Sequence, residues 1–199
     1  MIIFGKFSRT LVVGKSASGK SVLVNKIIEK KSSLFEGKID DVLYISPEPV
    51  ATIRAKKVKF LRKVPDKIPP NSLVVIDDAM LDTDILKRVS QLAIRDIHHT
   101  NSHLILIVQR LYVDNPHYRV IVDQMTHIIL FKLTKGFNTL SRLVRDVFPT
   151  SYKNYFWSAY EQATSRSYSH LLMDISGNVP LDECLYSDIC GKPLLYKKN

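Results

Sequence analysis

The eight residues Gly14–Ser21 constrain this chain more than any other segment. They read Gly-Lys-Ser-Ala-Ser-Gly-Lys-Ser and satisfy the pattern G-x-x-x-x-G-K-[ST] in full. The apolar run Thr10–Val13 precedes them, and the amphipathic stretch Lys20–Lys31 follows. The pattern therefore lies between an expected strand and an expected helix, which is the setting that a phosphate-binding loop needs. The plainer interpretation, a Gly-Ser surface loop, does not require these neighbours.

Each part of this motif has a physical task in binding a triphosphate. The glycines let the chain curl so that its N–H groups point at phosphate oxygens, and the positive end of the following helix faces the same anion. We expect Lys20 to contact the β- and γ-phosphates and Ser21 to offer its hydroxyl to Mg²⁺. The expected cofactors are ATP and Mg²⁺. The expected nucleotide-binding residues are Gly14, Lys15, Ser16, Ala17, Ser18, Gly19, Lys20 and Ser21.

Short apolar runs alternate with amphipathic stretches along most of the chain, which indicates an α/β fold with a mostly parallel sheet covered on both faces. Tyr168–Ile175 alternates weakly and is interpreted as a late edge strand. At 199 residues we expect one ATPase domain over 1–183 and a loosely held C-terminal tail over 184–199. The strand candidates are 10–13, 42–45, 73–76, 104–108 and 128–131, and the helix candidates are 20–31, 84–98, 138–147 and 152–163.

Composition narrows the functional classes. The chain has 29 Lys and Arg against 19 Asp and Glu, a net charge of +10, which favours a polyanionic partner. Two cysteines, Cys184 and Cys190, exclude a disulfide scaffold and are expected as free thiols. The apolar runs are far shorter than the ~20 residues of a membrane span, and we see no signal peptide. We therefore expect an intracellular protein without a transmembrane segment.

A second acidic element follows the apolar run Leu73–Ile76. Asp77 and Asp78 stand where the acids of a Walker B element stand, after a buried strand. We expect Asp77 to hold Mg²⁺ and Asp78 to orient or deprotonate the attacking water. Glu is commoner at the second place, and capping of the following turn is the alternative for Asp78.

Gln109 comes directly after the apolar run 104–108. In P-loop ATPases with an added strand between the Walker A and Walker B strands, a polar side chain at this strand end faces the γ-phosphate. Glutamine can donate to a phosphate oxygen and accept from water, so we expect a sensor role. An ordinary polar residue at a strand end is the alternative.

Taken in order, these pieces resemble the viral genome-packaging ATPases of the FtsK/HerA superfamily, of the poxvirus, polinton/adintovirus and virophage type. The likeness spans about residues 8 to 150, and Arg110 and Asp123 depart from it, since the family often has Asn near both places. It implies a RecA/FtsK-like P-loop NTPase fold, a three-layer sandwich. The segments that carry the likeness are Gly14–Ser21, 75–78, His98-His99 with the run to Gln109, and Arg119 with 129–132.

The resemblance also implies partners and a further catalytic residue. The partners are double-stranded DNA, other copies of the chain in a pentameric or hexameric ring, and a capsid protein at a vertex or on a membrane. The implied location is the host cytoplasm or nucleus, with association with the virion left open. Arg119 is the first candidate for an arginine that reaches the next subunit's γ-phosphate, and a plain surface charge is the alternative. The other arginine candidates are Arg88, Arg95, Arg142 and Arg145.

Two further clusters have open interpretations. His98 and His99 suit joint metal binding poorly, because neighbouring helix residues point about 100° apart; a subunit or DNA contact and plain surface packing remain. A basic run is a candidate grip on DNA phosphates, with Lys132 and Lys135 as a weaker one, or it is a solvated face. The run comprises Arg54, Lys56, Lys57, Lys59, Arg62 and Lys63.

The function expected from all of this is ATP-driven translocation of double-stranded DNA into a preformed capsid. A small P-loop kinase for a nucleotide or metabolite is an alternative that explains the loop but not Asp77, Asp78 and Gln109 together. A protein that binds nucleotide without hydrolysing it, and tethers DNA or assists assembly, is the third class. A GTPase is disfavoured, because no convincing Asn-Lys-x-Asp segment is present.

Overall fold

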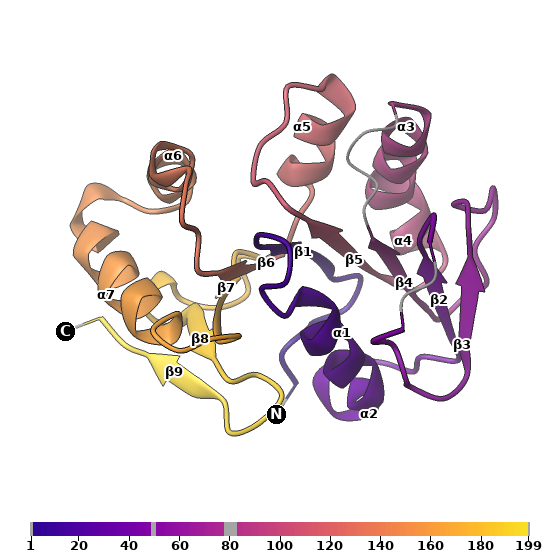
Figure 1. The fold of residues 1–199 in the computed structure, drawn as a ribbon, viewed down its shortest axis with the longest axis horizontal. Helices are drawn as coiled ribbons and strands as arrows, with labels where there is room; N and C mark the ends of the chain where they lie inside the picture. The colour runs from indigo at the N-terminus through magenta and orange to yellow at the C-terminus, as the bar shows by residue number, and fades with distance from the viewer. Residues whose placement is uncertain (1, 49–50, 78–82, 199) are drawn as a thin grey trace.

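The computed structural model describes residues 2–48, 51–77 and 83–198. Within them, nine strands form one sheet in the order β3-β2-β4-β5-β1-β6-β7-β8-β9 (Figure 1). The strands are β1 (Arg9–Val13), β2 (Asp41–Ile45), β3 (Val58–Leu61), β4 (Ser72–Asp77), β5 (His103–Val108), β6 (His127–Phe131), β7 (His170–Asp174), β8 (Leu185–Ser187) and β9 (Leu194–Tyr196).

The strands from β3 to β6 along this order are parallel to one another, and β7, β8 and β9 each pair antiparallel with the strand before them in the order. The mostly parallel sheet is therefore confirmed. Strand β5 lies between β4 and β1, so it separates the strand that ends in Asp77 from the strand that leads into Gly14.

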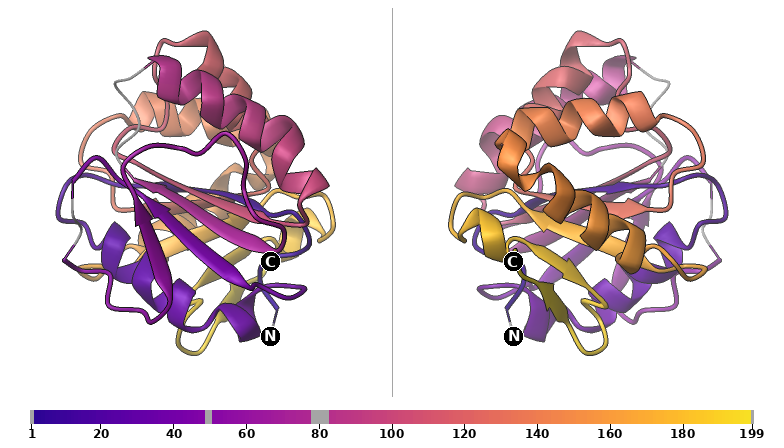
Figure 2. Two further views of the ribbon diagram at one scale, coloured as in Figure 1. Left: turned by 90° about the vertical axis from the view of Figure 1, so that its right-hand side faces the viewer. Right: turned by 90° about the vertical axis from the view of Figure 1, so that its left-hand side faces the viewer.

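Helices cover both faces of the sheet. Helices α3, α4, α5, α6 and α7 pack on one face and α1 and α2 on the other, so the three-layer architecture is confirmed (Figures 1 and 2). None of the described helices has the length and apolar character needed to cross a membrane. The helices are α1 (Lys20–Glu29), α2 (Lys31–Leu34), α3 (Thr83–Gln91), α4 (Ile97–His99), α5 (Pro116–Asp123), α6 (Phe137–Val147) and α7 (Lys153–Ala163), with a π-helical turn at Leu92–Asp96 and 3₁₀ turns at Thr150–Tyr152 and Leu181–Glu183.

Strand β5 shows how the apolar runs build two cores. Leu104 and Leu106 point to the layer of α3–α7, while Ile105 and Ile107 point to the layer of α1 and α2, and all four are buried. Alternate side chains of a strand face opposite sides of the sheet. A fully apolar run is therefore what a strand between two helical layers requires.

The C-terminal part differs from the sequence-based expectation. Residues 184–199, expected as a loose tail, carry β8 and β9, and Leu185 is fully buried. The strand expected at the sheet edge, β7, is present but lies inside the sheet between β6 and β8. Strands of three residues are too short to show a period of two, which is why the sequence pattern did not predict them. Cys184 and Cys190 are free thiols, as expected.

Two internal elements were also missed. Strand β3 lies inside the basic run, where exposed lysines hide its short pattern. Helix α5 has a clear start signal, because the Asn115 side chain accepts hydrogen bonds from the N–H groups of His117 and Tyr118, and Pro116 occupies the first turn. Asparagine followed by proline is a common helix start, so the sequence did carry this information.

Candidate functional site

The loop Gly14–Ser21 connects the end of β1 to the start of α1, as the motif requires. The Gly14 N–H donates to the Val108 carbonyl oxygen at 3.3 Å, which joins the loop to the end of β5. Ala17 and Gly19 adopt left-handed conformations, with φ of 59° and 99°. Such residues turn successive N–H groups toward one side, which is the geometry of an anion-binding loop.

Gly14 is required by close packing. A side chain there would bring a Cβ to 2.9 Å from the Phe131 Cβ, closer than real Cβ atoms approach one another. The end of β6 therefore packs directly against the start of the loop. Only a glycine at position 14 lets the loop lie this close to Phe131.

Lys20 is the first residue of α1, and its ammonium group donates to the carbonyl oxygens of Gly14 and Lys15, both at 2.8 Å. These bonds bring the positive charge back over the start of the loop. A cation held at this place is positioned for an anion that the loop N–H groups also contact.

Asp77 is the last residue of β4 and contacts a residue that sequence analysis did not single out. The buried Tyr44 hydroxyl donates to Asp77 Oδ2 at 2.7 Å. Burial raises the pKa of Tyr44 above its ordinary value, the nearby Asp77 charge and hydrogen bond raise it further, and a hydrogen bond with Ser21 opposes the shift. Tyr44 thus remains a neutral phenol that is hydrogen-bonded to Asp77 and lies near Ser21.

These residues fit a magnesium site. Asp77 accepts a hydrogen bond from the Tyr44 hydroxyl, and Ser21 lies close enough to influence the pKa of that hydroxyl, so a hydroxyl from α1 and a carboxylate from β4 are both near Tyr44. Mg²⁺ prefers oxygen ligands and takes few of them from protein, the rest being phosphate oxygens and water. In the described ranges, no group of three or more His, Cys, Asp or Glu side chains could form a different metal site.

Gln109 follows the last residue of β5 and is exposed at the same edge of the sheet as the loop. Gln109 and Lys15 line one cleft of about 430 Å³. Gln109 thus follows the strand that lies between β1 and β4, which is where a residue that senses the γ-phosphate is expected. The sensor role of Gln109 stays a prediction. Asp78, the expected water-orienting residue, lies outside the described residues.

Arg119 lies on α5 and does not contact the phosphate loop of its own chain. Its guanidinium bonds to Asp114 at 2.6 Å, and both side chains are exposed, at 67% and 94%. An exposed arginine on a loosely held ion pair is free to exchange partners at low energetic cost. The trans-acting role of Arg119 remains a prediction.

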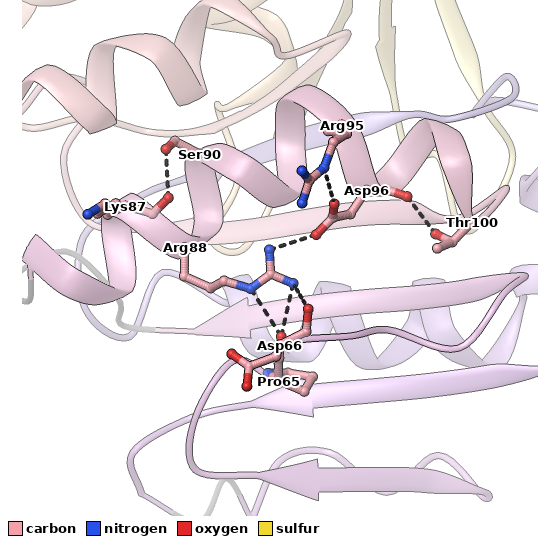
Figure 3. Close-up of polar contacts among 8 residues, drawn as sticks. All are labelled: Pro65, Asp66, Lys87, Arg88, Ser90, Arg95, Asp96 and Thr100. Atoms are coloured by element: carbon pink, nitrogen blue, oxygen red, sulfur yellow. Dashed lines mark hydrogen bonds and ion pairs between the residues drawn. The ribbon is translucent and has the colours of Figure 1, made fainter.

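Arg88 has a different environment from Arg119. It bonds to Asp96 at 2.6 Å and to the carbonyl oxygens of Pro65 and Asp66, with the two charged side chains only 16% and 14% exposed (Figure 3). This network ties α3 to the segment before β4. Arg88 is therefore held within its own subunit, which removes it as a candidate for a reach across an interface.

The other arginine candidates lie at the surface. Arg95 pairs with the far side of Asp96 at 3.0 Å, and Arg142 stacks over the Tyr112 ring at 5.3 Å. Arg145 is exposed near the end of α6. None of these contacts distinguishes an interface arginine from a surface charge.

The six basic residues of the run 54–63 are all exposed. Four of the run's residues form β3, which is the edge strand of the sheet, and Lys59 pairs with Asp41 at 2.6 Å. The run thus places exposed basic side chains at the edge strand, with the exposed Phe60 among them, while the weaker candidates Lys132 and Lys135 line clefts beside Lys15.

His98 and His99 lie at the end of α4, which leads into the start of β5. They therefore lie where the parallel strands begin, whereas the phosphate loop lies where these strands end. Both are exposed, and the His98 ring packs on Phe7 with centroids 4.6 Å apart. This arrangement offers no shared metal site and leaves an interface role as a prediction.

No protein-family model and no curated protein matches this sequence. Solved structures do match. B204, the DNA-packaging ATPase from Sulfolobus Turreted Icosahedral Virus, aligns with a TM-score of 0.54 and 16% identity over 97% of this chain and 98% of that one. The genome packaging NTPase B204 from Sulfolobus turreted icosahedral virus 2, in complex with AMPPCP, aligns with a TM-score of 0.54, 18% identity and the same coverage. The chain therefore has the α/β P-loop fold of these packaging ATPases.

Proposed function

We propose that this chain is an ATPase that drives double-stranded DNA into a preformed viral capsid. The observation that carries the proposal is that three groups lie where the parallel strands end: the loop Gly14–Ser21 after β1, Asp77 at the end of β4, and Gln109 directly after β5, which lies between those two strands. Structural likeness to two viral packaging ATPases supports the choice of motor over other P-loop proteins.

The chemistry assigned to the chain is hydrolysis of the β–γ phosphate bond. Loop N–H groups and the Lys20 ammonium bind the phosphates and stabilise the charge that develops on the γ-phosphoryl oxygens. Ser21 and Asp77, beside the Tyr44 hydroxyl, would hold Mg²⁺, which would supply positive charge to the phosphates when bound. Asp78 is proposed to orient the attacking water and accept its proton. Gln109, at the end of β5, is proposed to sense the γ-phosphate.

Ring assembly supplies the remaining parts. We propose that identical subunits form a closed ring of five or six, in which Arg119 of one subunit reaches the nucleotide of the next. The exposed position of Arg119 on α5 supports this role.

The basic surface at β3 is the proposed grip on DNA. A motor that moves any sequence needs contacts to phosphates rather than to base edges. The exposed side chains of Arg54, Lys56 and Arg62 and their neighbours provide such contacts. The further partners in this proposal are a capsid protein at a vertex or on a membrane, inside the host cell or in the virion.

The test is ATP hydrolysis by the purified chain, with and without linear duplex DNA of unrelated sequences. We expect DNA to stimulate turnover, and Lys20→Ala to abolish it. Lys38→Ala removes an exposed charge remote from the loop and should leave turnover unchanged. Joint replacement of Lys56, Lys57 and Lys59 by Glu should weaken DNA affinity and flatten its salt dependence by nearly one unit of slope for each lysine that contacts a phosphate.

Each contrary outcome identifies a different error. Unchanged turnover in Lys20→Ala would refute the site assignment. Consumption of ATP only with an acceptor molecule present would indicate a kinase. ATP binding without hydrolysis, even with DNA and an assembled ring, would indicate the non-hydrolysing tethering class. An unchanged salt slope in the Glu variant would exclude β3 as the grip while leaving the ATPase intact.

A further inference from the structure

The segment between α7 and β7, residues 164–169, lies beside the phosphate loop. Strand β7 runs antiparallel to β6, and His170 at its start pairs with Phe131 at the end of β6. The end of β6 pairs in turn with the end of β1, where Val13 aligns with Leu130. Chain topology therefore brings 164–169 to the edge of the sheet where the nucleotide site is expected.

Tyr168 in this segment packs directly on the loop. A Cβ built on Gly19 would lie 3.0 Å from Cδ1 and 3.3 Å from Cβ of Tyr168, so the ring covers the residue that caps the N-terminus of α1. Despite this contact, Tyr168 is 71% exposed and is among the most exposed large side chains in the described residues. The rest of the ring is available to another molecule.

The backbone conformation of Tyr168 is unfavourable for a bulky residue. Its φ is +66°, a left-handed conformation that suits Gly or Asn and is rare for a bulky residue. Neither burial nor backbone preference accounts for a tyrosine at this place. A strained residue beside a binding loop is the kind of feature that persists at functional sites.

The ring borders a cleft of suitable size. The cleft has a volume of about 340 Å³ and lies between the loop, at Lys15, Ala17 and Ser18, and the segment 164–169. That segment reads Thr-Ser-Arg-Ser-Tyr-Ser, so hydroxyl groups and one guanidinium surround the ring. An aromatic face with polar groups around it matches a flat heteroaromatic ring joined to a sugar.

We propose that Tyr168 is the platform on which the base of the bound nucleoside triphosphate stacks, while Gly14–Ser21 holds its phosphates. This inference rests on the proposed nucleotide site and adds the side of the loop on which the nucleoside lies. Stacking uses the π-face that every base has. Purine triphosphates should therefore bind with similar affinity, ATP and GTP differing by less than about tenfold.

The experiment measures the Kd of ATP, GTP and inorganic tripolyphosphate by calorimetry in the presence of Mg²⁺. Tyr168→Asn removes the ring with a residue that tolerates a positive φ, and Tyr168→Phe keeps the ring. Ile94→Asn is the matched control, since Ile94 is an exposed apolar residue of the π-helical turn Leu92–Asp96 and lies outside the phosphate loop, the Tyr44 contact and the basic run. Circular dichroism and thermal melting establish that each variant is folded.

We expect Tyr168→Asn to raise the Kd of ATP and GTP by about 5- to 150-fold and to leave that of tripolyphosphate within about twofold. Tyr168→Phe and Ile94→Asn should behave as the unaltered chain. Equal ATP affinity in Tyr168→Asn would overturn the platform while tripolyphosphate binding still supports the phosphate loop. An equal loss for ATP and tripolyphosphate would show that the ring only supports the loop, which also overturns the platform.

Two results separate this inference from the proposed function. If the unaltered chain binds neither ATP nor tripolyphosphate, the nucleotide site itself is wrong and the platform falls with it. If Tyr168→Asn leaves nucleotide affinity unchanged but weakens binding of single-stranded DNA, Tyr168 stacks on a nucleic acid base instead. Should Tyr168→Asn not fold, equal affinity of the unaltered chain for ATP and tripolyphosphate would still overturn the proposal.

Discussion

Removing the Tyr44 hydroxyl tests whether the two Walker elements are held together in the way the structure shows. Tyr44→Phe keeps the buried ring and deletes the 2.7 Å bond to Asp77. A hydrogen bond to a charged group contributes about 1.5–3 kcal/mol, so we expect the free energy of unfolding to fall by about that amount. For a chain of this length the melting temperature should fall by about 3–12 °C.

Tyr118→Phe is the matched control. Tyr118 is as buried as Tyr44, but its hydroxyl donates to the neutral carbonyl oxygens of Arg110 and Leu111 at 3.0 and 3.2 Å. A neutral hydrogen bond contributes about 0.5–1.5 kcal/mol, so this change should cost less than Tyr44→Phe. Urea unfolding followed by circular dichroism, without nucleotide or Mg²⁺, measures both.

A double-mutant cycle isolates the contact. In an Asp77→Ala background, Tyr44→Phe should be nearly neutral or stabilising, because the hydroxyl has lost its carboxylate partner. The coupling energy should exceed about 1 kcal/mol. A value below about 0.5 kcal/mol would refute the reasoning, since independent sites add within that margin. The Mg²⁺ concentration for half-maximal hydrolysis should also rise about tenfold in Tyr44→Phe, as expected for a group that orients a metal ligand.

Two further predictions concern stability. Arg88→Ala should lower the free energy of unfolding by about 3–5 kcal/mol, because it leaves the mostly buried Asp96 without its closest cation. Arg95→Ala, at an exposed arginine, should lower it by less than about 1 kcal/mol. Equal melting temperatures for the two variants would contradict this prediction. Burial lowers the pKa of His103 and of His170 to about 4, against about 6.5 when unfolded, so stability is full above pH 6.5 and is lost as the pH falls toward 4. Asp188 and Lys26 act on the His170 pKa in opposite directions. His170→Phe should retain about 2–3 kcal/mol that the unaltered chain loses between pH 7 and pH 4.5 in urea unfolding, and an equal loss in both would exclude this titration.

The sequence predicted those parts of the protein that are determined locally. The loop Gly14–Ser21 needs only its own glycines and the helix that follows, and the middle of each of the five central strands is apolar because both faces are buried. Asp77 could be placed at a strand end because the apolar run before it already indicated a buried strand. Helix α5 had a local start signal at Asn115 that was available but not used.

The remaining parts depend on strand order, which a local pattern does not contain. Tyr44 and Asp77 are 33 residues apart and meet because β2 pairs with β4. Tyr168 reaches Gly19 only because β7 turns back antiparallel beside β6. Arg88 was indistinguishable from a surface arginine until Pro65 and Asp96 were placed around it. The sequence thus predicts the loop and the acidic strand end of the candidate nucleotide site, whereas the contacts between distant segments follow only from the fold.

Polar residues at the two ends of β4 fix the register of this strand, and the register decides which of its side chains face which helices. Leu73 and Val75 face α1, while Val74 and Ile76 face the opposite layer, and all four are apolar and buried. Hydrophobicity alone therefore does not distinguish this register from one shifted by a single residue, which would exchange the faces. Ser72 bonds to Pro69 and Ser102 at one end, and Asp77 bonds to Tyr44 at the other. Shifting the strand would break both sets of bonds and turn the carboxylate away from Tyr44, so the contacts that fix the strand also position the carboxylate that we propose as a magnesium ligand.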